Sequence, residues 1–227
     1  MDPEPVKWPR DSICLRPGSQ GADSSAAAVY RCTCRCDFNA PGFCVLNLGQ
    51  DLAPEAFRRW MIDLKREMAA IHERATGKTL AYVSAGRFDQ QETTRPHLDG
   101  GPRECFLMLG YEPSAIDSEI EMFDYTKCAF DLGLTPDEFL ARHNPMFKAG
   151  RDILRPYSVR IPCFSKRDYR IVCINNSSAP YAESQPAWQG VLHTARILGP
   201  DESERRFVNS TLIAPVPAGT PDEVDAW

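Results

Sequence analysis

The chain has 227 residues, of which 43% are hydrophobic and 10% aromatic, so it can bury one sizeable core and is not mainly disordered. Its net charge of -5 and lack of a basic run argue against binding nucleic acid through counterion release. No window approaches the roughly 18 apolar residues of a membrane span, and the N-terminus lacks the pattern of a secretion signal. We expect a cytoplasmic protein with a small-molecule or peptide substrate and no membrane or nucleic-acid partner.

The nine cysteines are odd in number and no secretion signal accompanies them, so we expect reduced thiols. Cys32, Cys34 and Cys36 alternate along the chain and would share one face of a strand. A zinc site normally needs a two-residue spacer and a second ligand pair, and neither is present here. The pattern favours three small buried residues on a strand over a metal or redox role.

The predicted elements begin with an irregular arm. Residues 1 to about 28 hold four prolines and a stretch rich in Ser, Gly and Ala, which is typical of such an arm. A strand is predicted over 42–48. A helix is predicted over 54–76 because apolar residues recur at helical spacing, with Pro54 suited to its first turn and Gly77 to its end.

Strands dominate the rest of the chain. The runs rich in β-branched and aromatic residues are 80–88, 105–109, 157–164, 169–174, 187–198 and 207–214. A helical insert is predicted at about 114–144, because Thr135 to Glu138 has the form of a capping box and Pro145 follows. Short strands beside a long helix favour an antiparallel sandwich or jelly roll, mainly β with flanking helices.

The sequence contains four histidines: His72, His97, His143 and His193. His72 lies off the apolar stripe of the predicted long helix. His143 falls in the last turn of another predicted helix, where a cation is favoured. For these two histidines we therefore expect structural roles.

His97 and Asp99 are two residues apart, so both side chains point to the same side of an extended segment. His193 lies within a late predicted strand and is the candidate for a third ligand. Two histidines and one carboxylate leave three adjacent coordination positions for a co-substrate and dioxygen, as in non-haem iron oxygenases. The same spacing is also compatible with two structural histidines that bind no metal. In that case His97 is a loop histidine and His193 is a buried, hydrogen-bonded histidine of a strand.

The order of elements over roughly residues 40–215 resembles the superfamily of 2-oxoglutarate and Fe(II)-dependent oxygenases. In that superfamily a long helix precedes a double-stranded β-helix (jelly roll), with a His-x-Asp pair after an early strand and a distal histidine on a late one. His97, Asp99 and His193 hold these places. The resemblance implies one oxygenase-like domain over 29–227 that binds Fe(II), 2-oxoglutarate and dioxygen. It further implies hydroxylation or a related oxidation of the substrate.

The resemblance also implies an arginine that begins the next strand and binds the far carboxylate of 2-oxoglutarate. A guanidinium offers a carboxylate paired donors. Arg206 is our first choice, because Arg206, Val208 and Ser210 share one face of the following strand. The superfamily commonly has a serine two residues after the arginine, where this chain has Val208. Arg205 and Arg196 therefore remain alternative anchors.

The strand before the His-x-Asp pair often lines the co-substrate pocket in that superfamily. Alternation groups Tyr82 with Ser84 and sets Arg87 on the opposite face. Tyr82 is accordingly a candidate for cofactor binding. Trp188, near the distal histidine, fits a core position better than a pocket wall.

Three other functions are alternatives to the oxygenase. The leading alternative is a non-catalytic jelly-roll binding module in which His97 and His193 are structural. A cupin-type metal enzyme would usually show a His-x-His pair, and a zinc hydrolase a His-Glu-x-x-His or Cys-x-x-Cys pair. None of these pairs occurs in the sequence.

Overall fold

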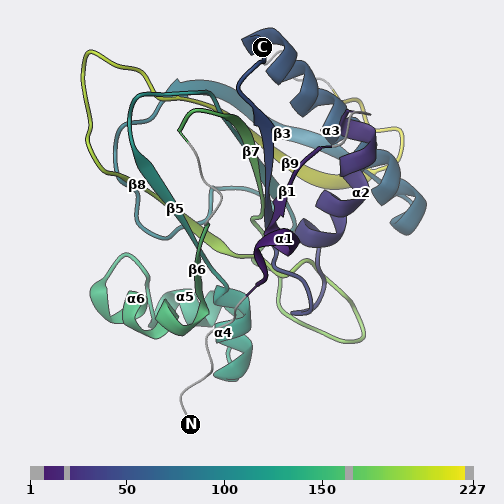
Figure 1. Ribbon diagram of the computed structural model, residues 1–227. Coiled ribbons are helices and arrows are strands. Elements are labelled where there is room, and N and C mark those ends of the chain that lie inside the picture. Colours follow the sequence, from purple (N-terminus) through teal and green to yellow (C-terminus); the bar gives the residue numbers. More distant parts are fainter. Residues whose placement is uncertain (1–7, 18–20, 162–165, 223–227) are drawn as a thin grey trace.

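The computed structural model describes residues 8–17, 21–161 and 166–222, and two β-sheets form its centre (Figure 1). The larger sheet has six strands in the order β1-β2-β7-β4-β9-β3. Their bounds are β1 Cys14–Leu15, β2 Phe43–Gly49, β3 Lys78–Asp89, β4 Phe106–Tyr111, β7 Tyr169–Asn175 and β9 Phe207–Pro217. The smaller sheet has three strands, ordered β6 (Ser158–Arg160), β5 (Ser118–Phe123) and β8 (Leu192–Ile197).

Apolar side chains from both sheets meet in one core. Leu107, Val172 and Leu212 of the larger sheet belong to the same buried cluster as Ile120 and Met122 of β5. Because alternate residues of a strand point to opposite faces, these residues define the inner face of each sheet. Their burial holds the two sheets face to face.

Two helices cover the outer face of the larger sheet, α2 (Ala22–Thr33) and α3 (Pro54–Thr76) (Figure 1). The predicted long helix is confirmed as α3, which has proline at its first turn and ends at Gly77 in the left-handed conformation, with φ 74°. Phe57 and Met61 are buried against the sheet. Within the described ranges, no helix has the length and apolarity that crossing a membrane requires.

The chain passes repeatedly from one sheet to the other. β3 lies in the larger sheet, and the following segment reaches β8 of the smaller sheet through an isolated bridge at His97. β4 returns to the larger sheet, β5 and β6 lie in the smaller one, and β7, β8 and β9 then alternate between the two. Strands that are distant in sequence therefore face each other across the core between the two sheets.

Helices gather at one end of the smaller sheet: α4 (Tyr125–Asp131), α5 (Pro136–Arg142), α6 (Lys148–Leu154) and the short 3₁₀ helix η1 (Arg155–Tyr157) (Figure 1). The predicted capping box at Thr135 is present. The predicted bounds of the insert, 114–144, are wrong at both ends. β5 occupies the first part, because Ile120 and Met122 alternate into the core, and α6 extends the helical part to Leu154.

The irregular N-terminal arm expected over residues 1–28 is partly structured. Within its described part, α1 (Arg10–Ile13) leads into β1, which pairs parallel with β2, and α2 begins at Ala22. Alanine is the strongest helix former, and Ala26 and Val29 of α2 are buried in the core beneath α3. Residues 1–7 and 18–20 of the predicted arm lie outside the described residues.

The cysteine cluster does not lie on a strand, contrary to the prediction. α2 continues through Thr33, so Cys32 falls in its last turn and Cys34 at its C-cap. Cys14 is disulfide-bonded, so the expectation of reduced thiols is wrong at this residue. The other cysteines in the described part of the chain are free.

A bulge in β3 corrects the predicted grouping of Tyr82 and Ser84. Tyr82 is opposite Ile213 of β9, whereas Ser84 is opposite Leu212, because the register shifts between them. One extra residue in a strand reverses the facing of everything beyond it. Tyr82 therefore shares the outer face with Arg87, and Ser84 faces inward.

Candidate metal centre

His97 and His193 lie side by side where the chain crosses between the sheets. Each donates its backbone N–H to the carbonyl oxygen of the other, at 3.1 Å in both directions. Their ring centroids are 4.3 Å apart. Asp99 follows, and one ligand atom from each of the three residues lies within 4.8 Å of the other two. The structure thus brings together all three residues that the sequence selects as metal ligands.

The imidazole of His97 is oriented by the chain just before it. Its Nδ1 lies 2.7 Å from the carbonyl oxygen of Arg95, which can only accept, so Nδ1 carries the proton. In the neutral ring, Nε2 then has a free lone pair, 3.4 Å from Oδ1 of Asp99. Contact with Asp99 raises the pKa of His97, and burial opposes this.

His193 is placed on the inner face of β8, directly opposite Met122, and is 6% exposed. Burial lowers its pKa to about 4, and the charge of His97 acts in the same direction. Among the described residues its buried Nδ1 has no hydrogen-bond partner. The ring is therefore neutral near pH 7, which is the form that binds a metal.

The donor set fits a divalent metal. Burial alone would raise the pKa of Asp99, but the hydrogen bond to His97 and the nearby imidazole groups lower it, so the carboxylate is ionised. Within the described residues, its only ion-pair contact is with His97. Two imidazole lone pairs and one carboxylate match the two-histidine, one-carboxylate ligand set of non-haem Fe(II).

The backbone of Asp99 is anchored by Asn176, a residue that the sequence analysis did not select. Asn176 Nδ2 donates to the carbonyl oxygen of Asp99 at 2.8 Å, and the N–H of Asp99 donates to Asn176 Oδ1 at 3.0 Å. Asn176 is buried just beyond β7. The sequence signal that points to Asn176 is its position directly after a fully buried strand. Only the fold shows that its side chain contacts Asp99.

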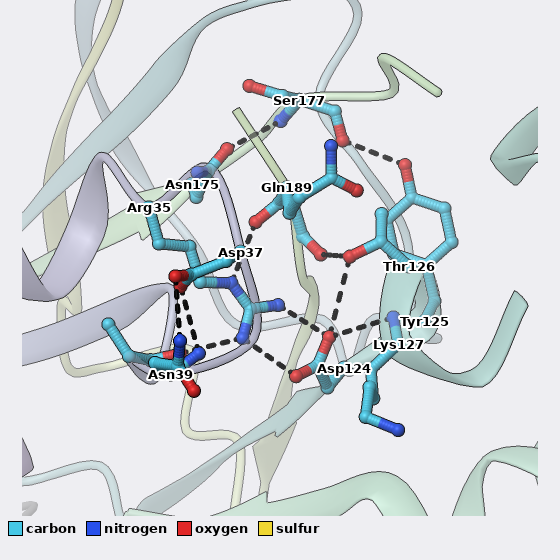
Figure 2. Close-up of polar contacts among 12 residues, drawn as sticks. Arg35, Asp37, Asn39, Asp124, Tyr125, Thr126, Lys127, Asn175, Ser177 and Gln189 are labelled. Carbon is cyan, nitrogen blue, oxygen red and sulfur yellow. Dashed lines mark hydrogen bonds and ion pairs between the residues drawn. The ribbon is translucent and has the colours of Figure 1, made fainter. Parts of the chain in front are cut away.

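A buried ion pair supports the segment that enters β8 (Figure 2). Arg35 donates from both terminal nitrogens to the carboxylate of Asp124, at 2.5 and 2.8 Å. The Nε of Arg35 donates to the carbonyl oxygen of Gln189 at 2.9 Å, and the hydroxyl of Thr126 donates to that of Gly190 at 2.8 Å. The loop after α2 and the start of α4 therefore hold the approach to the distal histidine.

Arg206 is buried inside the molecule, at 2% exposure, and is not a solvated surface arginine. Its Nε lies 3.2 Å from the hydroxyl oxygen of Ser118 on β5, and its Nη1 donates to Oε1 of Gln90 at 2.9 Å. Its Nη2 has no hydrogen-bond partner among the described residues. The guanidinium also lies 4.9 Å from the ring centroid of Tyr111.

The other candidates for cofactor binding are placed differently. Ser210 alternates with Leu212 on β9, so it faces the inner side with the candidate metal ligands. The side chain of Arg205 is 63% exposed and pairs with an aspartate on β3, and that of Arg196 is 66% exposed. Tyr82 lies on the outer face and packs against the core beneath α3. Arg206 and Ser210 are thus on the side of the metal centre, whereas these three residues are not.

His72 and Trp188, for which the sequence favours structural positions, contact each other in the structure. His72 Nδ1 lies 2.7 Å from the hydroxyl oxygen of Tyr30, and its ring meets that of Trp188 edge-on at 5.3 Å. Trp188 is buried in the core beneath α3, in keeping with the core position expected for it.

Comparison with known proteins does not assign the chain to a family. No protein-family model matches it, and no curated protein is significantly similar to it. Among solved structures, it is similar to an iron and alpha-ketoglutarate-dependent endoperoxidase, NvfI. The TM-score is 0.39 and the sequence identity 13%, with 84% of this chain and 82% of that chain covered. A likeness this low does not establish a shared activity.

Proposed function

We propose that this protein is a non-haem Fe(II), 2-oxoglutarate-dependent dioxygenase that hydroxylates or otherwise oxidises a small-molecule or peptide substrate. The observation that carries the proposal is the cluster of His97, Asp99 and His193, with ligand atoms within 4.8 Å of one another. The passage of successive strands between two facing sheets is what a double-stranded β-helix requires, so the fold supports the same proposal.

In this proposal five residues have defined roles. Nε2 of His97, the ring of His193 and the carboxylate of Asp99 hold the metal. Arg206 and Ser210 receive the far carboxylate of 2-oxoglutarate, for which a guanidinium offers paired donors. When bound, Fe(II) with 2-oxoglutarate and dioxygen supplies the oxidising chemistry. The apolar residues between the sheets exclude water from the reacting atoms.

The test is an oxygen-free titration of the protein with Fe(II) and 2-oxoglutarate, followed through the weak visible charge-transfer band of the chelate. We expect a band in the wild type, its loss in His97→Ala and its retention in His143→Ala, which removes a histidine at the C-cap of α5. A well-folded wild type without the band would favour the alternative function, a non-catalytic binding module with structural histidines.

A further inference from the structure

A cavity of about 290 Å³ lies between the turn that joins α4 to α5 and the loop that follows β7. Its walls are mainly apolar and include Phe130, Leu134, Pro136, Pro180 and Tyr181. Of the described residues that line it, none is a candidate metal ligand. Binding sites for small molecules usually measure roughly 300–1,000 Å³. The cavity therefore has the size for a small ligand, at a place separate from the candidate metal centre.

Two aromatic rings form one side of the cavity, which we call the aromatic corner. The rings of Phe130 and Tyr181 meet at an interplanar angle of 75°, with their centroids 5.1 Å apart. Phe130 is 48% exposed although its side chain is large and apolar. Aromatic rings prefer offset-stacked and edge-to-face contacts, so a flat ring that stacks on one of the two meets the edge of the other. The aromatic corner therefore favours an aromatic ligand over a flexible aliphatic chain.

Gln189 brings a polar atom to this cavity. The residue lines the cavity and is 0% exposed. Its Nε2 donates to the carbonyl oxygen of Ala187 at 3.0 Å, whereas its Oε1 has no hydrogen-bond partner among the described residues. Figure 2 shows the amide on the side of Thr126, which also lines the cavity. A buried acceptor without a donor costs free energy, so a donor on a ligand would stabilise the complex at this oxygen.

The backbone of Gln189 is held on both sides by Arg35. The N–H of Gln189 donates to the carbonyl oxygen of Arg35 at 2.9 Å, and Nε of Arg35 donates to the carbonyl oxygen of Gln189 at 2.9 Å (Figure 2). Arg35 is itself fixed by its buried ion pair with Asp124. The acceptor is therefore placed before any ligand arrives, which lowers the entropy cost of binding.

Other polar groups at the cavity already have partners. The hydroxyl of Thr126 donates to a backbone carbonyl oxygen at 2.8 Å. Oε2 of Glu138 accepts from the N–H and the hydroxyl of Thr135, at 2.9 and 3.0 Å. The ammonium of Lys127, near the aromatic corner, is paired with Asp131. Since these charges are already engaged, the cavity suits a neutral ligand.

We infer that this cavity binds a neutral, flat aromatic small molecule of the indole class, with its ring in the aromatic corner and its N–H donating to Oε1 of Gln189. The inference does not depend on the proposed function, because the site contains no candidate metal ligand. Gln189 belongs to the segment that enters β8, so the ligand contacts the part of the chain that leads to His193.

The test compares indole with benzothiophene, which has the same bicyclic shape but sulfur in place of the N–H group. Dissociation constants for the full chain without metal are measured by calorimetry and ligand-observed NMR. We expect the wild type to bind indole about threefold to tenfold more tightly, as for one neutral hydrogen bond. Gln189→Met keeps the side-chain length but removes the acceptor, so it should bind both compounds alike. Gln185→Met, at an exposed position of the same loop, should keep the preference for indole.

A second pair of variants tests the aromatic corner. Phe130→Ala should weaken the binding of both compounds, because it removes one of the two rings. Leu132→Ala, at a residue that is 50% exposed and outside the cavity lining, should bind both like the wild type.

Three outcomes would overturn the inference. They are a folded wild type that binds neither compound, a wild type that binds both equally, and an unchanged preference for indole in Gln189→Met. Should Gln189→Met not fold, the preference of the wild type and the comparison of Phe130→Ala with Leu132→Ala decide the question.

Discussion

The side chain of Asn176 holds Asp99 in the way that a neighbouring strand would. Its amide hydrogen-bonds to both the N–H and the carbonyl oxygen of Asp99, at 3.0 and 2.8 Å. Asp99 lies outside the strands, so this side chain takes the place of a partner strand. The position of this candidate carboxylate ligand therefore depends on a residue 77 positions away in sequence.

We expect Asn176→Ala to weaken Fe(II) binding by about tenfold to a hundredfold, the usual effect of removing a residue that orients a metal ligand. Anaerobic competition with a chelator of known affinity measures this. Asn39→Ala, at an exposed asparagine hydrogen-bonded to Asp37, is the control. Equal affinity in Asn176→Ala and wild type would show that Asp99 keeps its position without this contact.

His72 makes stability depend on pH and is not one of the candidate metal ligands. Burial lowers its pKa below the ordinary value of 6.5, and the charge of Lys78 adds to this, so the folded state keeps the ring neutral. The unfolded chain takes up a proton below about pH 6.5. Stability from the neutral ring is therefore present above that pH and is lost as the pH falls toward the folded pKa.

We expect the free energy of unfolding of the wild type to fall more steeply than that of His72→Phe below about pH 6.5. The difference is at most about 1.4 kcal/mol per pH unit for one group. Urea denaturation of both proteins at several pH values measures this difference. The other acid-sensitive groups are the same in both proteins, so their contributions cancel in the comparison. Parallel curves of unfolding free energy against pH would mean that His72 has the same pKa in the folded and unfolded states.

At the scale of elements, the entry into β8 leaves no room for a side chain at Gly190. A Cβ there would overlap the backbone of Ser177, which follows β7. The two segments approach this closely because the N–H of Val191 donates to the carbonyl oxygen of Asn175 at 2.9 Å. Backbone cannot move aside as a flexible side chain can, so this glycine fixes where β8 begins.

We expect Gly190→Ala to destabilise the protein by about 1–3 kcal/mol, as overpacking does. It should also weaken Fe(II) binding, because the start of β8 carries His193. Gly199→Ala is the matched control, since a Cβ at Gly199 meets nothing within 4 Å. Thermal unfolding and metal titration of the two variants test this, and similar behaviour of both would refute a role for the close approach.

At the scale of the whole molecule, the ion pair of Arg35 and Asp124 joins three distant parts of the chain. It links the loop after α2 to the start of α4, and through Gln189 to the entry of β8 (Figure 2). The side chains are 1% and 9% exposed. Removal of one partner therefore leaves the other charge buried without an opposite charge beside it.

We expect Arg35→Met to lower the free energy of unfolding by about 3–5 kcal/mol, and a double variant with Asp124→Leu to lose less than the sum of the two single changes. Lys148→Met, which breaks an exposed pair with Asp152, should change stability by less than about 1 kcal/mol. Denaturant unfolding of the four variants gives these values. Additive losses would show that the two buried charges act independently.

The elements that the sequence predicts correctly are those that local interactions determine. α3 follows from helical spacing between a proline and a glycine, and α5 from its capping box. The spacing of His97 and Asp99 likewise requires only an extended segment. Periodicity and capping act between residues a few positions apart, so the sequence by itself determined α3, α5, most strands and the choice of the candidate ligands, but not α1, α2 or α6.

Tertiary structure alone decided which distant residues meet. The sequence does not show that β5 is a strand of a second sheet, that a bulge turns Tyr82 outward, or that Asn176 anchors Asp99. Nor does it show that Arg206 is buried whereas Arg205 beside it is exposed. Strand pairing and the burial of charge depend on segments far apart in sequence, so a local sequence pattern does not predict either of them.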